Sequence, residues 1–241
     1  MGARSLTFAP RMPDLRRLGR RAGVVGIALV VLVAGYMLLL RDSSLVAVER
    51  VSVTGAEREP AVEAALAAAA TEMTTLHVDE DALRAAVADQ PSVLALDATA
   101  DFPHGLTIEV DVRRPVAYLE ANGGTILAED GVALDTGVER PVGVPAVEVE
   151  AAVVGGRAEG AALALARVLG ASPEVLLTQA ESARVTEEGP VVSVGPGIEL
   201  RFGDPSKAEL KWSAAAAILA DPNLDSAAYI DLSVPSRPVI G

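Results

Sequence analysis

The sequence predicts an α+β protein that one N-terminal transmembrane helix anchors and that carries two folded domains beyond this helix. Three observations support this expectation. Residues 22–40 hold no charged side chain. Further along, alanine-rich stretches with helical character stand beside valine-rich stretches that alternate with polar residues. Aromatic residues make up only 3% of the chain, whereas 51% of it is hydrophobic, so aliphatic side chains must fill the cores.

The apolar stretch, "AGVVGIALVVLVAGYMLLL", would be about 28 Å long as a helix, which is enough to cross the hydrocarbon core of a bilayer. A buried core helix is one alternative, but such helices are rarely apolar on every side over this length. A cleaved signal peptide is the other. Its apolar region is usually shorter, and Leu39-Leu40-Arg41-Asp42 offers no pattern of small residues for cleavage. We therefore expect an uncleaved transmembrane helix at 22–40.

The charges around this helix predict its orientation. The tail 1–21 holds six arginines and one acidic residue, Asp14, whereas only Arg41 lies close after the helix. Because positive flanks stay in the cytoplasm, residues 41–241 are expected outside it. They hold 14 Lys and Arg against 32 Asp and Glu, a net charge of −18, which argues against binding nucleic acid or anionic lipid. The tail's arginines favour headgroup contact over nucleic acid; they are Arg4, Arg11, Arg16, Arg17, Arg20 and Arg21.

No catalytic, metal or cofactor site is predicted. The chain lacks cysteine, and His77 and His104, the two histidines, have no second ligand at metal-binding spacing. Each lies beside a predicted turn, where a hydrogen-bonded histidine is the ordinary expectation. The glycine-rich stretches 122–124 and 195–197 are better explained by turns than by phosphate binding. We expect a protein that is not an enzyme and binds no cofactor and no small-molecule substrate.

The first outer domain is predicted to have the order β-α-α-β-β. Pro60 is well placed in the first turn of a helix, and Asp79 can cap a second helix that Pro91 ends. Residues 101–105 have the composition of a turn. Two helices on one face of a three-stranded sheet would satisfy this order. The predicted elements are strands at 46–55, 92–100 and 106–113 and helices that begin at Pro60 and Glu80.

This first domain should end at Arg113-Arg114-Pro115, because Pro115 cannot donate to a strand ladder. We therefore place one domain at 45–114 and a second at 115–241. In the second domain, Glu187-Glu188-Gly189 predicts a hairpin turn, and helices are expected near 159–169 and 206–220. Ser206 and Glu209 have the spacing of a capping box. An antiparallel sheet with helices on one face is the predicted arrangement.

Several segments, read in order, resemble one protein family. "VERVSVTG", "LHVDEDALRAAV" and "FPHGLTIEVDVRRPVAYLE", after one membrane helix, resemble the POTRA domain of the FtsQ/DivIB family of bacterial division proteins. The resemblance continues in "AEDGVAL" (128–134), "GVPAVEV" (143–149), "IELRFGDPSKAELKWSAAAAILADP" (198–222) and "YIDLSVPSRPVI" (229–240), which are similar to the elements of the family's distal β domain. The resemblance thus covers nearly the whole chain. It rests on the order and completeness of these segments, and none of them is a catalytic motif.

The resemblance implies a cell division scaffold in the bacterial plasma membrane, with a cytoplasmic N-terminus and a location at the septum. It also implies that the last strand is a sheet edge that accepts a strand of FtsB, itself paired with FtsL. The residues of this predicted edge strand are Tyr229, Ile230, Asp231, Leu232, Ser233 and Val234. The residues alone leave both readings open and slightly favour an ordinary closing strand. Pro235 and Pro238 limit how far any further ladder could extend.

Two other functions are compatible with a membrane-anchored outer part. A ligand-binding or sensing module would need a concave pocket with convergent polar groups, and no such set is visible in the sequence. A hydrolase of the cell envelope is disfavoured, because no nucleophile motif is present and the two histidines are poorly placed.

Overall fold

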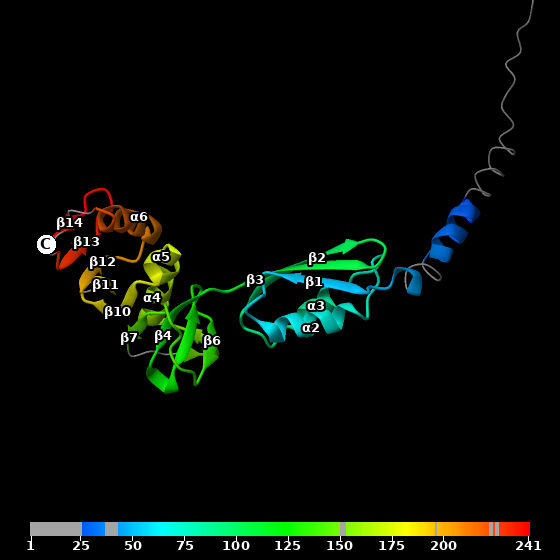
Figure 1. Ribbon diagram of the computed structural model, residues 1–241, viewed down its shortest axis with the longest axis horizontal. Coiled ribbons are helices and arrows are strands. Elements are labelled where there is room, and N and C mark those ends of the chain that lie inside the picture. Colours follow the sequence, from blue (N-terminus) through cyan, green and yellow to red (C-terminus); the bar gives the residue numbers. More distant parts are fainter. Residues whose placement is uncertain (1–25, 37–42, 150–152, 196, 222–223, 225–226) are drawn as a thin grey trace, which may run out of the picture. The chain divides into compact units, whose positions relative to one another are not determined.

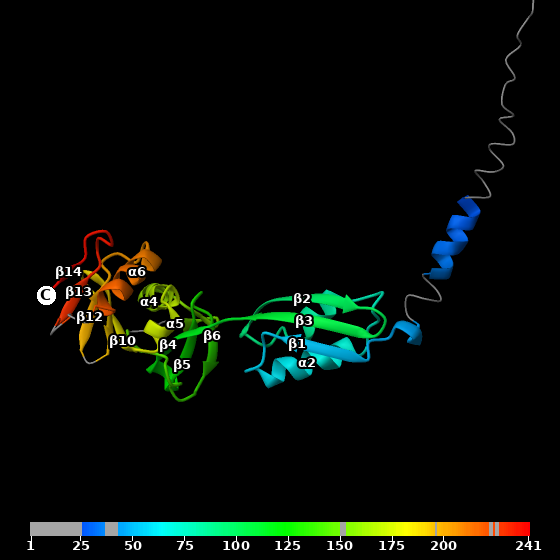
Figure 2. The same ribbon diagram turned by 45° about the horizontal axis from the view of Figure 1, so that its top comes forward.

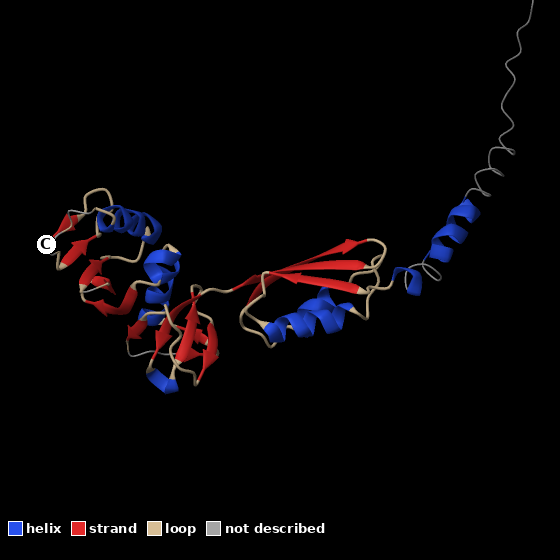
Figure 3. Ribbon diagram, viewed as in Figure 1, coloured by secondary structure: helices blue, strands red, loops and turns tan. Residues whose placement is uncertain are grey.

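The computed structural model describes residues 26–36, 43–149, 153–195, 197–221, 224 and 227–241. Helices and sheets are both present in quantity, so the predicted α+β class is confirmed (Figure 3). The chain divides into two compact units. The first unit runs to Ala86 and includes Asp97–Glu109; the second unit comprises Val87–Leu96 and Val110–Gly241. The domain boundary expected at Pro115 stays a prediction.

The predicted arginine tail, 1–21, lies outside the described residues, as do both ends of the predicted transmembrane segment. Between those ends, residues 26–35 are helical and their large apolar side chains are exposed. None of the helices in the described ranges combines the length and the apolar character needed to cross a bilayer. The membrane span therefore stays a prediction.

The first unit contains two helices on one face of a three-stranded sheet (Figures 1 and 2). The strand order is β1-β3-β2, and β1 is parallel to β3 with Arg50 opposite Gly105. Val62 and Leu66 of the first helix and Leu83 of the second are buried. The elements are η2 (Ser44–Val46), β1 (Arg50–Thr54), α2 (Pro60–Ala70), α3 (Glu80–Ala86), β2 (Val93–Asp101) and β3 (Gly105–Val112). The start of β2, up to Leu96, and the end of β3, from Val110, belong to the second unit.

The local signals in this part of the sequence are confirmed where they concern helix starts. Pro60 opens α2, and the Asp79 carboxylate accepts the backbone N–H of Ala82 at 3.0 Å at the start of α3. The first strand is shorter than predicted. It begins at Arg50, because Val46 and Val48 direct backbone hydrogen bonds to the segment 73–75 and not to the sheet.

The second unit is built on a nine-stranded sheet with the order β14-β13-β12-β11-β10-β7-β4-β5-β6. A separate short hairpin, β8 (Val153–Val154) and β9 (Arg157–Ala158), precedes the first helix of this unit. The strands of the large sheet are β4 (Pro115–Leu119), β5 (Thr125–Ala128), β6 (Ala133–Thr136), β7 (Ala146–Glu148), β10 (Ala180–Thr186), β11 (Gly189–Val194), β12 (Ile198–Arg201), β13 (Tyr229–Asp231) and β14 (Val239–Ile240).

Helices α4 (Gly160–Gly170), α5 (Glu174–Leu177) and α6 (Ala208–Leu219) cover one face of this sheet (Figure 1). Trp212 of α6 is fully buried, and its indole N–H donates to the carbonyl of Val168 at 2.7 Å. Its ring lies 5.1 Å from that of Phe202, centroid to centroid. The only tryptophan of the chain thus joins both long helices to the end of β12.

The expected antiparallel sheet is wrong in part, because three pairs of neighbouring strands are parallel. They are β4 with β7, β7 with β10, and β12 with β13. Parallel neighbours need a crossover connection, and α4 and α6 provide it for the last two of these pairs. Both helices were expected from the sequence, so a strand, a helix and a strand in succession already contained the signal for parallel pairing.

Helix α6 also begins differently from the prediction. Lys207 is its N-cap residue, in the left-handed conformation with φ 56°, and no side chain caps the helix. The N–H of Ser206 donates to the Asp204 carboxylate at 2.6 Å instead, so the expected capping box is wrong. The hairpin turn at Glu187-Glu188 between β10 and β11 is confirmed, with Thr186 opposite Gly189.

Replacement of Gly189 by alanine should strongly destabilise the second unit. Its φ is +119°, and a Cβ there would lie 1.7 Å from the carbonyl oxygen of Gly203, which is backbone and cannot move aside cheaply. We expect Gly189→Ala to lower the free energy of unfolding by about 3 kcal/mol or more. Gly195→Ala is the matched control. Its φ is +52° but its surroundings are open, so a loss of about 1 kcal/mol is expected in urea unfolding. Equal losses would contradict this packing argument.

Candidate functional site

The predicted edge strand divides into a strand and a turn. Tyr229, Ile230 and Asp231 form β13, whereas Leu232, Ser233 and Val234 follow it. β13 is not the edge of the sheet, since β12 lies on one side of it and β14 on the other. The chain reverses after Val234, where the N–H of Arg237 donates to the Val234 carbonyl at 2.9 Å. The expected position of the edge is therefore corrected to the two residues after Pro238.

The hydrogen bonds of the last residues decide which backbone groups are open. Gly241 and Tyr229 exchange both N–H···O bonds, each 3.1 Å long. Hydrogen-bonded and non-hydrogen-bonded pairs alternate along an antiparallel ladder, so Ile240, opposite Ile230, is in a non-hydrogen-bonded pair. Its N–H and C=O therefore point away from β13. Pro238, two residues earlier, has no N–H, so Ile240 supplies the outward donor of β14.

The side chains around this edge are partly apolar. Val239 and Ile240 are 56% and 51% exposed, whereas Ile230 is buried in the core. On the opposite face of the sheet, the Arg201 guanidinium lies 4.0 Å from the centre of the Tyr229 ring. A partner strand at β14 would thus meet one backbone N–H, backbone carbonyls and two aliphatic side chains.

Asp231 ends β13 by a local hydrogen-bond pattern. Its carboxylate accepts the hydroxyl of Ser233 at 2.6 Å and the N–H of the same residue at 2.8 Å. The Ser233 hydroxyl is the main reason why the pKa of Asp231 is lowered, and the positive charges of Arg201 and Lys211 act in the same direction. The ionised carboxylate therefore holds the turn that leads to β14.

The opposite edge of the sheet, β6, is partly blocked. The N–H of Ala133 donates to the carbonyl of Gly156 at 2.8 Å, and Val132 forms an isolated bridge with Arg157. The Asp135 carboxylate accepts the N–H of Thr136 at 2.8 Å. A covering segment and a carboxylate on the strand are both known ways to prevent pairing at an edge. Of the two ends of this sheet, β14 is the one that stays available.

Lys211 supports the β12 end of the sheet from within, a role that no local pattern of residues predicts. A lysine in an alanine-rich helix is usually solvated, yet Lys211 is only 1% exposed. Its ammonium donates to the carbonyls of Phe202 and Asp204, both at 2.7 Å. Gly203 lies between them, and a Cβ there would be 2.8 Å from the Ser233 hydroxyl. Lys211 therefore fixes the loop against which the end of β13 packs.

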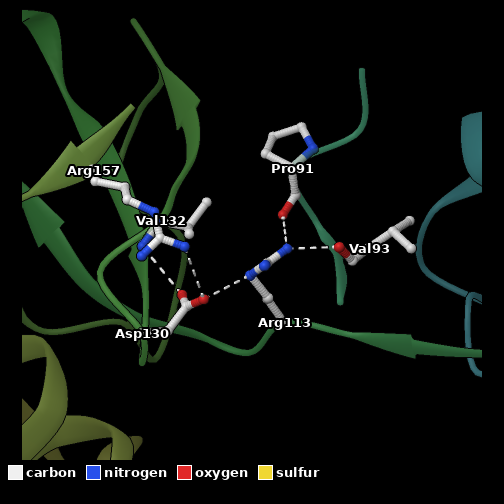
Figure 4. Close-up of polar contacts among 6 residues, drawn as sticks. All are labelled: Pro91, Val93, Arg113, Asp130, Val132 and Arg157. Carbon is white, nitrogen blue, oxygen red and sulfur yellow. Dashed lines mark hydrogen bonds and ion pairs between the residues drawn. The ribbon is translucent and has the colours of Figure 1, made fainter. Parts of the chain in front are cut away.

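Arg113, at the predicted domain junction, is the centre of a second polar cluster (Figure 4). Its Nε donates to the Asp130 carboxylate at 3.0 Å, and one Nη donates to the carbonyls of Pro91 and Val93 at 2.8 and 2.6 Å. Asp130 also accepts the N–H of Val132 at 3.2 Å. All of these residues belong to the second unit, so Arg113 joins the start of β2 to the β5–β6 hairpin.

Arg114, the next residue, binds the C-terminal end of α4. Its guanidinium donates to the carbonyls of Gly170 and Ser172. Carbonyls at the end of a helix have no partner within the helix, and a basic side chain is a favourable donor to them. The two arginines before Pro115 thus hold the segment that leads into β4.

Both histidines lie in the first unit. In the part of the chain that the structure describes, no group of His, Asp and Glu could hold a metal ion. Nδ1 of His104 lies 3.0 Å from the Ala47 carbonyl, which confirms the expected role in a turn. His77 is half-buried beside an open depression of 510 Å³ in the first unit. In the second unit, a depression of 570 Å³ lies between the loop 140–144 and Thr178–Ser182.

Comparison with curated proteins gives a consistent set of relatives. The chain is 30% identical to the cell division protein FtsQ of Streptomyces collinus over 95% of this chain and 90% of the relative. It is 32% identical to FtsQ of Streptomyces venezuelae over 63% of this chain and 54% of that protein. For FtsQ of Streptomyces coelicolor the identity is 25%, over 89% and 85%. No protein-family model matches the chain.

Removal of the Lys211 ammonium should destabilise the second unit. Lys211→Met keeps the aliphatic stem but leaves two carbonyls at the end of β12 without their donor, at an expected cost of about 2–4 kcal/mol. Lys207→Met, at the exposed N-cap residue of the same helix, is the control and should change stability by less than about 0.5 kcal/mol. Chemical denaturation of both variants measures this difference in stability. A Lys211→Met protein as stable as the control would contradict the supporting role of Lys211.

The Asp130 cluster should make stability depend on pH. Partial burial alone would raise the pKa of Asp130, but the Arg113 guanidinium and the Val132 N–H outweigh it and lower this pKa. The resulting stabilisation is complete above the unfolded value of about 3.9 and is lost as the pH falls through the lower folded pKa. Between pH 5 and pH 2, taken as an approximate window, Asp130→Asn should lose less stability than the native chain. Parallel curves for the two proteins would exclude this linkage.

Proposed function

Because the chain belongs to the FtsQ family of cell division proteins, we propose that it is a membrane-anchored scaffold of the bacterial division machinery that performs no chemistry itself. The observation that carries this proposal is the open edge of the nine-stranded sheet at β14. A scaffold needs a surface that accepts a partner, and an unpaired strand edge is such a surface.

In this mechanism, the outer segment of an FtsB-like protein, paired with an FtsL-like protein, adds a strand beside β14. The N–H and C=O of Ile240 supply the backbone hydrogen bonds, and Val239 and Ile240 supply side-chain contacts. Pro238 limits the ladder on one side, so the partner strand is expected to continue past Gly241 or to bind through side chains as well. Selectivity would come from the half-exposed aliphatic residues at the edge.

The membrane part of the proposal rests on the sequence. Residues 22–40 form the anchor, the arginine tail 1–21 stays in the cytoplasm, and residues 41–241 lie outside the cytoplasm at the septum. Residues 45–114 form the POTRA domain and residues 115–241 the distal β domain. Confinement to one membrane raises the effective concentration of membrane-bound partners, so a short strand interface suffices for assembly.

Replacement of Ile240 by proline tests the scaffold and its edge together. Ile240→Pro removes an N–H that points away from β13, so the sheet should stay folded while the affinity for the partner falls by about tenfold or more. The measurement is binding of the full-length chain in nanodiscs to the FtsB and FtsL proteins of the same organism. Ile240→Ala is the control, because it shortens the side chain and keeps the N–H.

The outcomes distinguish a failure of the scaffold proposal from a failure of the edge mechanism. If the native chain does not bind these proteins, the scaffold proposal fails. If the native chain binds and Ile240→Pro binds equally well, the edge mechanism fails and the scaffold stands. A proline at Leu232 is less suitable, because the N–H of Leu232 donates to the Arg201 carbonyl at 2.8 Å within the sheet. That substitution would disturb folding.

A further inference from the structure

Three large apolar side chains are exposed at one end of the first unit. Leu45 is 73% exposed, Phe102 is 71% exposed and Leu76 is 37% exposed. They come from three separate segments: η2, the link between α2 and α3, and the loop between β2 and β3. Neither the fold of this unit nor the open strand edge of the second unit accounts for their exposure.

A buried threonine holds the three segments together. Thr75 is 8% exposed, its N–H donates to the Val46 carbonyl at 2.8 Å, and its hydroxyl donates to the Pro103 carbonyl at 2.9 Å. Leu45, Leu76 and Phe102 are each adjacent in the sequence to one of these three bonded residues. The backbone at all three residues is therefore held close together at this end of the unit, and we call the three exposed side chains the lipid-contact patch.

Further bonds make this end of the unit rigid. The carbonyl of His104 accepts the N–H groups of Glu49 and Arg50 at 2.9 and 3.0 Å, and Ala47 forms an isolated bridge with Thr74. The apolar side chains thus lie on a cross-linked base at the start of β1. Because this base is rigid, the exposure of the three apolar side chains is a property of the fold.

The length of the chain places this patch beside the proposed anchor. Leu45 is five residues after position 40, where the predicted transmembrane helix ends, and five extended residues span at most about 18 Å. If residues 22–40 cross the membrane, Leu45 is held within that distance of the bilayer, and Thr75 holds Leu76 and Phe102 next to it. We propose that Leu45, Leu76 and Phe102 insert into the interfacial layer of the membrane. This inference rests on the proposed membrane anchoring.

The charge of the outer part indicates which interaction drives this contact. Its net charge of −18 opposes attraction to anionic headgroups, so insertion depends on apolar side chains. Leucine and aromatic residues at an interface bury to a depth of about 5–10 Å at the boundary of headgroups and acyl chains. The patch should therefore bind a zwitterionic bilayer without any anionic lipid.

The size of the patch argues against a second protein as the occupant. A stable protein interface buries about 800 Å² per partner. Three side chains at these exposures offer roughly 300–400 Å², because even a full aromatic side chain buries only about 150–250 Å². A lipid surface needs no such minimum when a covalent anchor already holds the chain at the membrane.

Tryptophan fluorescence tests the proposal in the full chain. Trp212, the only native tryptophan, is fully buried in the core of the second unit and gives a constant background. Phe102→Trp adds a reporter at the patch, and Leu45→Trp adds one from a second segment. Each full-length variant is reconstituted in phosphatidylcholine vesicles with or without brominated acyl chains. We expect bromine to quench the added tryptophan, more strongly near the headgroup than near the chain end.

Arg58→Trp is the matched control. Arg58 is exposed in the same unit, but it follows the far end of β1, four residues after Thr54. Its added fluorescence should be unaffected by bromine. Vesicle flotation reports the anchor independently in every sample.

Three outcomes would overturn the proposed lipid contact. If the chain floats with the vesicles and Phe102→Trp and Leu45→Trp are no more quenched than Arg58→Trp, the patch is overturned while the anchor stands. If the chain does not float, the anchor and the patch both fail. An emission shift of Phe102→Trp that depends on protein concentration and not on bromine would identify a second copy as the occupant and would also overturn the proposal.

Discussion

Every N–H and C=O group of a buried strand needs a partner, and this requirement explains where the nine-stranded sheet of the second unit ends. At β6, the carbonyl of Gly156 and the carboxylate of Asp135 take up amides that another strand would need. At the other end, the last residues fold back on Tyr229 and Ile230, which leaves the N–H of Ile240 directed away from the sheet. The chain therefore blocks part of one edge and leaves the other open. A scaffold that recruits its partner by strand addition needs this asymmetry.

Basic side chains satisfy the backbone groups that helices and strands leave unpaired. Lys211 takes the carbonyls after β12, Arg114 takes those at the end of α4, and Arg113 takes those at the start of β2. Lys211 and Arg114 hold segments that follow a strand or a helix of the second unit, and Arg113 joins the start of β2 to the β5–β6 hairpin through Asp130. In the first unit, Thr75 has the same role for the segments that carry the lipid-contact patch. One principle, the pairing of buried polar groups, thus underlies both proposed surfaces.

Signals that act within a few residues could be predicted from the sequence. Pro60, Asp79 and the turn at Glu187-Glu188 are of this kind, and all three are confirmed. The parallel pairs are not predicted, although the sequence predicts the crossover helices α4 and α6 of two of them, because the hairpin turn at Glu187-Glu188 favours antiparallel neighbours. The resemblance implies an edge at residues 229–234, and the two residues of β14 are too few to show an alternating pattern that would indicate a further strand. Arg113 reaches carbonyls about twenty residues away, which no local signal reveals.

Amide hydrogen exchange of the full-length chain, with and without the FtsB and FtsL proteins, tests the central claim most directly. The account predicts that the amide of Ile240 exchanges quickly in the free chain, because it has no partner within the sheet, and becomes protected when the partner binds. The amide of Leu232, already bonded to Arg201, should be protected in both states. Protection confined to the helices or to β6, with the exchange of Ile240 unchanged, would contradict strand addition at β14.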